Sequence, residues 1–364
     1  MPKFILAALL CLHGFSHITG FAEAADPIAN TGLTMPVSKA YGALWMACAF
    51  LFILSAAAYV SRRDTWWMLA LAGVALSQFL AVAFWADAKF GTIPNLLILI
   101  AVLAAFLHWR FRRAALRDVA ALLADAGPAS AIVNEAALAQ LPGPVATWLR
   151  RAEVIGKPLV RTARLRQAAT MRTAPEGRWM PVHAEQWFNA EKPGFVWLAD
   201  VTAGPGFHIA GRDSLLGARG RMCVKALSCL PIADATGPEI DQGALVRYLA
   251  EIIWLPSAAL RGGIQWTAGG PRSATATLAV GETSAEVCFE FNAAGDPERI
   301  RARRYYTRPG GATLEPWRVD LDPDSFDTRN GIRIPTRATV TWDLETGAFE
   351  WYRAEVEHAD WNGV

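Results

Sequence analysis

The stretch FGTIPNLLILIAVLAAFLHWRFRRAALR, at residues 90–117, carries the two signals that decide how the N-terminal part of the chain is built. Its first twenty residues are almost entirely apolar, and its last eight include four arginines. An apolar run of ~20 residues is long enough for a helix to cross the ~30 Å hydrocarbon core of a bilayer. Because Lys and Arg are retained on the cytoplasmic side, the arginines predict that this span ends in the cytoplasm.

Three further apolar runs precede it, at residues 4–21, 41–60 and 66–85. Basic residues flank alternate ends of these runs, at Lys3 and at Arg62–Arg63, whereas the other two loops hold one lysine each, balanced by acidic residues. This alternation predicts a multi-pass protein of the bacterial inner membrane with both chain ends in the cytoplasm. The first run resembles a cleavable secretory signal, but its length and its two histidines favour a retained span.

A few polar residues interrupt the predicted spans and the outer turn between the third and fourth spans. They are His13, His17, Gln78, Asp87 and Asn95. The two histidines lie four residues apart and share one helix face. Because polar groups inside a bilayer usually face the interior of the helix bundle, we expect these intramembrane residues to find partners there. Two interpretations stay open: hydrogen bonding between helices, and a proton or metal site.

The remaining chain follows a different pattern. Residues 110–140 read as a basic, helical juxtamembrane linker with a break at Gly127–Pro128, and residues 141–364 form short strand-like runs separated by glycines. Strands are expected near 160–167, 178–189, 194–203, 206–213, 218–229, 263–268, 273–280, 284–292, 298–306, 332–343 and 347–358. One apolar stripe predicts a helix over Pro238–Trp254. We therefore expect an α+β protein: a four-helix transmembrane bundle at 1–109 and a curved antiparallel sheet, or half-barrel, with an inserted helix.

Large aromatic side chains are frequent on the expected strands, and a curved sheet lined by such residues can enclose an apolar ligand. An ordinary packed core explains the same pattern. The candidate ligand-binding residues are Trp179, Trp187, Trp197, Trp254, Trp266, Arg161, Arg164, Arg166, Glu239 and Asp241. In this hypothesis the arginines contact a head group. The two acidic residues begin the inserted helix, where they also complement its dipole.

Composition and motifs exclude several classes of function. A net charge of +2 gives no reason to expect nucleic acid as a partner. The five cysteines show no CxxC spacing, and the sequence contains no nucleophile elbow, phosphate loop or HExxH motif. No cofactor, metal or catalytic residue is therefore predicted, and membrane lipids and an apolar small molecule are the expected partners.

Several motifs together resemble an uncharacterised bacterial membrane family, known only as a domain of unknown function. They are His13–His17 (HGFSH), Trp85–Thr92 (WADAKFGT), Trp179–Pro181 (WMP), Gly211–Asp213 (GRD), Gly237–Gly243 (GPEIDQG) and Gly331–Thr336 (GIRIPT). The resemblance implies four N-terminal spans but no activity. The order of strands and helices after residue 141 also looks like the half-barrel of LolA-like lipoprotein carriers, at the level of the fold only.

The sequence thus favours a membrane-anchored protein that binds a lipid or another apolar ligand in a β half-barrel. Two other classes stay open. One is an enzyme that acts on a membrane-embedded substrate, and the other is a ligand-free scaffold or assembly factor.

Overall fold

The computed structural model describes residues 3–26, 31–124, 126–127 and 131–363. The chain forms two compact units, one made of residues up to Phe111 and the other of residues from Arg112 onward. The helices of the first unit are α1 (Lys3–Ser16), α2 (Ile18–Ala25), α3 (Lys39–Val60), α4 (Trp66–Ala83), α5 (Trp85–Ala88), the 3-10 turn η1 (Lys89–Gly91) and the first part of α6 (Thr92–Ala124). Pro128 of the predicted linker break lies outside the described residues.

Within the described residues, four helical segments are long and apolar enough to cross a membrane. They are Phe4–Ala25, Lys39–Val60, Trp66–Ala83 and Trp85–Ala124, and each contains one of the predicted runs or nearly all of it. Helices α2 and α3 pack closely because Gly20 has no side chain. A Cβ atom at Gly20 would lie only 2.2 Å from the Trp45 ring.

The second unit contains α7 (Glu135–Leu138), α8 (Gly143–Arg151), α9 (Pro238–Glu251), and the 3-10 turns η2 (Ile252–Trp254), η3 (Pro256–Leu260) and η4 (Pro323–Ser325). Its strands are β1 (Thr162–Met171), β2 (Met180–Asn189), β3 (Gly194–Gly204), β4 (Phe207–Leu216), β5 (Arg219–Ala226), β6 (Leu230–Ala235), β7 (Ile264–Gly270), β8 (Ser273–Val280), β9 (Thr283–Phe291), β10 (Pro297–Arg308), β11 (Gly311–Leu321), β12 (Phe326–Arg329), β13 (Ile332–Pro335), β14 (Arg337–Leu344) and β15 (Gly347–Trp361).

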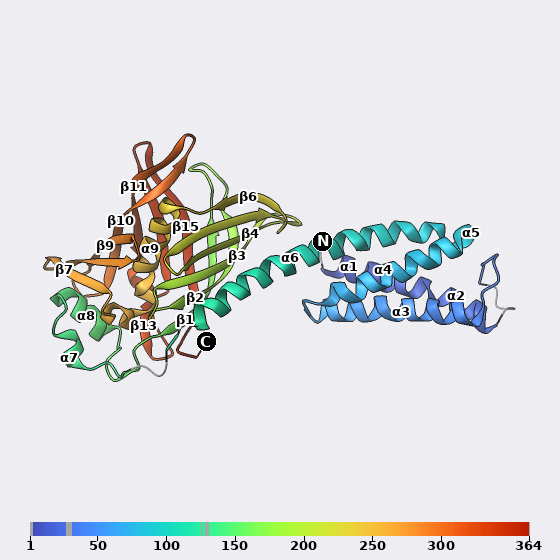
Figure 1. The fold of residues 1–364 in the computed structure, drawn as a ribbon, viewed down its shortest axis with the longest axis horizontal. Coiled ribbons are helices and arrows are strands. Elements are labelled where there is room, and N and C mark those ends of the chain that lie inside the picture. The colour runs from blue at the N-terminus through green and yellow to red at the C-terminus, as the bar shows by residue number, and fades with distance from the viewer. Residues whose placement is uncertain (1–2, 27–30, 125, 128–130, 364) are drawn as a thin grey trace. The chain divides into compact units, whose positions relative to one another are not determined.

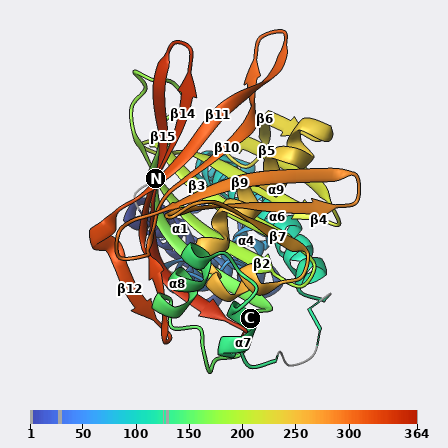
Figure 2. The same ribbon diagram turned by 90° about the vertical axis from the view of Figure 1, so that its left-hand side faces the viewer.

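Thirteen of these described strands form one antiparallel sheet, in the order β6-β5-β4-β3-β2-β1-β15-β14-β11-β10-β9-β8-β7. The sheet curls around α9, as Figure 1 shows. In Figure 2 the β10–β11 and β14–β15 hairpins project beyond the rest of the sheet. The predicted α+β class, with a curled half-barrel and an inserted helix, is confirmed.

The concave face holds the main hydrophobic core. Strand residues of one parity point into it, as Leu165, Phe188 and Phe195 do, and they pack with α9 residues such as Leu245 and Tyr248. Helix α9 begins at Gly237, whose φ of 118° is readily available only to glycine, followed by Pro238 in the first turn. Burial of this apolar face is the main stabilising term of the unit.

Two predicted strands need correction, and one long strand was missed. The run at 218–229 is two strands, β5 and β6, and the run at 332–343 is divided between β13, in a separate two-stranded sheet, and β14. Strand β11 was not predicted. Its first half is exposed on both faces and contains Pro316, so it lacks the alternation of apolar and polar residues that identifies a half-buried strand.

The first, helical part of the predicted linker is an integral part of this unit. Residues 112–124 of α6 lie on the convex face of the sheet, where Asn189 Nδ2 donates to the Leu122 carbonyl at 2.9 Å. Two ion pairs join the same surfaces, Arg112 with Asp200 at 3.6 Å and Arg212 with Asp118 at 3.3 Å. The helix buries Ala115, Val119 and Leu122.

The buried carboxylate of Asp296 links α8 to the strands of this unit. Asp296, whose side chain is 6% exposed, accepts hydrogen bonds from Arg151 at 2.7 and 2.9 Å and also pairs with Arg333. Burial opposes ionisation of this carboxyl, but the bonds from the two arginines hold its pKa below the ordinary value.

Candidate functional site

Four charged residues meet between α9 and the concave face of the sheet, and we call them the charged cluster: Asp213, Arg247, Glu251 and Arg304. Arg247 is at its centre. It donates to Glu251 at 2.9 Å and to Asp213 at 3.0 Å, and its guanidinium lies 4.9 Å and 5.0 Å from the ring centroids of Phe195 and Trp197. These contacts join one helix to two neighbouring strands.

Burial shapes the electrostatics of the cluster. It raises the pKa of the Asp213 carboxyl, although Arg247 and Arg304 act in the opposite direction. Burial also disfavours the charge of Arg247, but Glu251 and Asp213 keep its pKa above the ordinary value. Arg304 differs from Arg247 in the direction of this shift. Burial and the neighbouring Arg247 lower the pKa of Arg304 to about 10.

Uncharged polar groups extend the cluster along the sheet. Gln186 Nε2 donates to Glu251 at 2.6 Å, and Gln167 Oε1 lies 3.4 Å from the indole nitrogen of Trp197 and 3.5 Å from the hydroxyl of Tyr352. Burial raises the pKa of the Tyr352 hydroxyl. The result is a polar network inside an otherwise apolar core, with groups able to bind both cations and anions.

Beyond this network, the concave face carries partly buried apolar side chains near the ends of the strands. We call this set the concave apolar surface: Met171, Met180, Ile209, Tyr306, Val340 and Leu344. Cross-strand register places these residues on the core-facing side, since Met171 pairs with Met180 and Val340 pairs with Tyr352. Helix α9 packs mainly on β4, β5, β9 and β10. The Tyr306 ring lies 5.0 Å from that of Trp342, and Tyr306 is two residues from Arg304 on the same face of β10, which places this surface next to the charged cluster.

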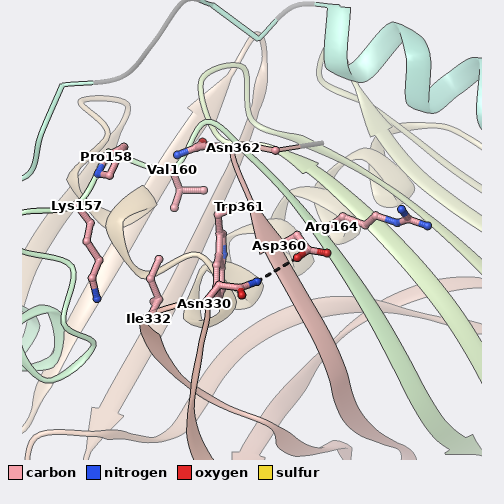
Figure 3. Close-up of a pocket in the computed structure, with 10 residues that line it drawn as sticks. Lys157, Pro158, Val160, Arg164, Asn330, Ile332, Asp360, Trp361 and Asn362 are labelled. Atoms are coloured by element: carbon pink, nitrogen blue, oxygen red, sulfur yellow. Dashed lines mark hydrogen bonds between the residues drawn. The ribbon is translucent and has the colours of Figure 1, made fainter.

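A cleft of about 490 Å³ lies elsewhere, between the start of β1, the end of β15 and the β12–β13 turn (Figure 3). Its charged groups already have partners within the fold. Asp360 accepts from Asn330 at 3.0 Å, Arg164 pairs with Glu185 at 3.3 Å, and Lys157 contacts the Gly331 carbonyl. The cleft therefore offers fewer free binding groups than the concave face.

The first unit brings together most of the predicted intramembrane residues. His13 Nε2 lies 2.8 Å from Asn95 Oδ1, and Asn95 Nδ2 donates to Gln78 Oε1 at 3.1 Å. His17 stacks on Phe52, and within the described residues neither of its ring nitrogens has a hydrogen-bond partner. Asp87 is separate from this group. It accepts hydrogen bonds from the backbone N–H groups of Thr34 and Met35 at 2.9 and 3.0 Å.

The predicted tryptophans do not form one lining. Trp197 lies on the concave face beside the charged cluster. Trp254 and Trp266 are core residues whose indole groups donate to the carbonyls of Pro335 and Ala259. Trp187 faces the convex side under Arg164, and Trp179 packs between Arg172 and Arg353.

The predicted charged residues are also dispersed. Arg161 contacts the Gly127 carbonyl, while Arg166 is exposed and Arg164 lies on the convex face. Glu239 is exposed. Asp241 is buried, accepts from the Gly220 backbone N–H at 2.6 Å and pairs with Arg219, which gives it a structural role at the start of α9.

Sequence reasoning assigned no function to the residues of the charged cluster. A usable signal exists, because Asp213 and Arg304 occupy strand positions of the same parity as the core residues Leu215 and Ile300. A charged residue at an inward position of a strand is costly unless it is paired or functional. Arg247 and Glu251 lie four residues apart on the predicted helix. Such pairs usually lie on the solvent-exposed face, so this spacing alone did not indicate a buried site.

Two of the solved structures to which this chain is similar come from bacteria. One is described as a "putative outer membrane lipoprotein-sorting protein domain" from Vibrio parahaemolyticus, with 8% identity and a TM-score of 0.31 over 56% of this chain and 86% of that chain. The other is a DUF1329 family protein from Desulfovibrio piger, with 10% identity and a TM-score of 0.29 over 61% and 93%. No curated protein matches the sequence. A family model matches residues 131–354, which include most of the half-barrel and all of its charged cluster, and the chain therefore belongs to this family of unknown function (DUF6544).

Proposed function

We propose that this chain is a membrane-anchored binding protein that holds an apolar ligand on the concave face of its β-sheet. The observation that carries the proposal is the concave apolar surface, where large apolar side chains stay partly exposed on the core-facing side. Solvent-exposed apolar groups that lie together commonly mark a binding surface. Methionines contribute to it, and their flexible side chains adapt to ligands of varied shape.

The proposed anchor is the set of four apolar helical segments. The distribution of Lys and Arg favours an orientation with both chain ends, and hence the half-barrel, on the cytoplasmic side. A tether to the bilayer raises the effective concentration of a binding domain near membrane ligands. Membrane lipids are accordingly the first class of ligand to test.

Photolabelling of the full-length chain tests the proposal. The chain is reconstituted into phosphatidylcholine nanodiscs that contain a long-chain alcohol with an alkyl diazirine near its end. After irradiation, adducts are mapped by peptide mass spectrometry. We expect adducts on peptides that contain Met171, Met180, Val340 or Leu344, because an apolar chain would be held against these side chains.

Two variants of the same kind separate binding from nonspecific contact. Val340→Arg places a charge on the concave apolar surface and is expected to remove most of the half-barrel adducts. Leu314→Arg makes the same change on β11, at an exposed position of opposite parity to the core-facing residues, and is expected to leave them unchanged. Half-barrel labelling that is absent, or that is equal in both variants, would refute the proposed function.

A further inference from the structure

One cation of the charged cluster, Arg304, differs from Arg247 in its hydrogen bonding. Arg304 extends from β10 toward α9, and its guanidinium lies 5.6 Å from the Trp317 ring centroid. Within the described residues it has no hydrogen bond or ion pair. Arg247 donates to both acidic members of the cluster, Asp213 and Glu251, and Glu251 also accepts from Gln186. The N–H donors of Arg304 therefore lack an acceptor in a partly buried position.

A second donor next to it is also unused. Trp317 is 4% exposed, yet its indole N–H has no hydrogen-bond partner among the described residues. A buried polar group without a partner is costly, so such groups often mark a place where a ligand or an ion binds. Two unused donors at one point of the concave face indicate an acceptor that carries negative charge.

The neighbouring residues fit this interpretation. Gly243 of α9 faces Arg304, and a Cβ atom there would lie 3.3 Å from Arg304 Nε, so the glycine leaves room for the guanidinium. Along β10, Tyr306 has the same parity as Arg304 and belongs to the concave apolar surface. An acidic group bound at Arg304 would therefore continue directly into an apolar contact.

We propose that the ligand is an amphiphile with an oxyanion head, a carboxylate or a phosphate, which Arg304 and the Trp317 indole N–H bind while its apolar chain lies on the concave apolar surface. This inference rests on the proposed function and names the class of its ligand. Guanidinium groups suit both oxyanions because their N–H donors form paired, charge-assisted hydrogen bonds.

The test uses the full-length chain in nanodiscs and two matched probes, a diazirine fatty acid and the diazirine alcohol of equal length. In the wild-type chain we expect the acid to reach half-maximal labelling of the half-barrel at about a tenfold lower concentration than the alcohol, the gain expected from one charge-assisted contact. Arg304→Met is expected to abolish this preference, so that the acid and the alcohol label the half-barrel at similar concentrations. Trp317→Phe keeps an aromatic ring, removes the N–H together with the pyrrole ring of the indole, and is expected to reduce the preference several-fold.

The matched control is Arg303→Met, because Arg303 is the adjacent residue of β10 and faces the opposite side, where it donates to the Leu314 carbonyl. This variant is expected to keep the tenfold preference. Dodecyl phosphate is expected to displace the acid probe, and inorganic phosphate at the same concentration is not. Equal displacement by both would assign the site to a free oxyanion and overturn the amphiphile.

The two proposals fail in different ways. If neither probe labels the half-barrel, the proposed function itself is wrong. If both probes label it with equal affinity in the wild-type chain and in Arg304→Met, the binding function stands and the acidic head group is refuted.

Discussion

Replacement of Arg247 by methionine tests whether the charged cluster is a balanced, buried ion network. The substitution keeps an unbranched side chain of similar length against Phe195 and Trp197 but removes the cation. Asp213 then loses its 3.0 Å partner and Glu251 its 2.9 Å partner, while Gln186 still donates to Glu251. The variant therefore leaves two acidic groups in a largely dehydrated site.

The expected magnitude follows from burial. The side chains of Arg247 and Glu251 are each 14% exposed and that of Asp213 is 25% exposed. Removal of one partner from a buried ion pair typically costs about 3–5 kcal/mol, because the remaining charge is not compensated. By contrast, the side chains of Arg150 and Glu135 form an ion pair that is 49% and 60% exposed. Arg150→Met should therefore lower the free energy of unfolding far less than Arg247→Met does.

The assay is guanidinium-induced unfolding of the full-length chain in detergent micelles, followed by pulse proteolysis of the half-barrel. A triple variant, with Arg247→Met, Asp213→Leu and Glu251→Met, adds a further test. Since apolar replacement of a whole buried network is often neutral, it should recover most of the loss. If Arg247→Met costs no more than Arg150→Met, or if the triple variant is the least stable, the network does not compensate buried charge as we argue.

Three further outcomes are expected. Asp296→Asn should destabilise the chain at pH 7, and the difference in stability from the wild-type chain should shrink as the pH falls below about 4. A carboxyl with a lowered pKa contributes stability above its unfolded pKa and loses it on protonation. Thermal unfolding at several pH values measures this difference, and a difference independent of pH would contradict the prediction. Gly220→Ala should cost about 1–3 kcal/mol in the same denaturation assay, since its Cβ would lie 2.5 Å from the Ile240 carbonyl oxygen, whereas Gly204→Ala, in open space, should be neutral. His13→Leu should weaken the helical unit by roughly 0.6–2 kcal/mol per lost contact, as its hydrogen bonds to α4 and α6 disappear, and unchanged resistance to unfolding in SDS would rule this out.

Three buried charges in the described part of the half-barrel, Asp296, Asp241 and Arg247, have charged or backbone partners within the fold. Asp296 is held between two arginines, and Asp241 is held by a backbone N–H and Arg219, so both act as structural links. Arg247 likewise has two acidic partners. Among the described residues Arg304 has no such link, and on this difference we base the proposal that it is a binding group.

Much of the architecture follows from local sequence. The four helical segments were predictable because each is a continuous apolar run, a pattern that depends only on neighbouring residues. Most strands were predictable for the same reason, since alternation of apolar and polar residues is a local property. Strand β11 escaped prediction because its first half extends beyond the core, where no buried face imposes that alternation.

The candidate site depended on contacts between distant residues. Asp213, Arg247 and Arg304 are separated by 34 and 57 positions, and only the curl of the sheet around α9 brings them to one place. In the sequence alone, the tryptophans and the arginines of β1 were the more conspicuous candidates, yet strand parity sends Arg164 and Trp187 to the convex face. The sequence by itself determined the membrane-type helices, the half-barrel class and the inserted helix, because hydrophobic periodicity is written in adjacent residues. The tertiary structure decided which charges are paired and which donors remain unused, because pairing depends on strand register and helix docking between segments far apart in the chain.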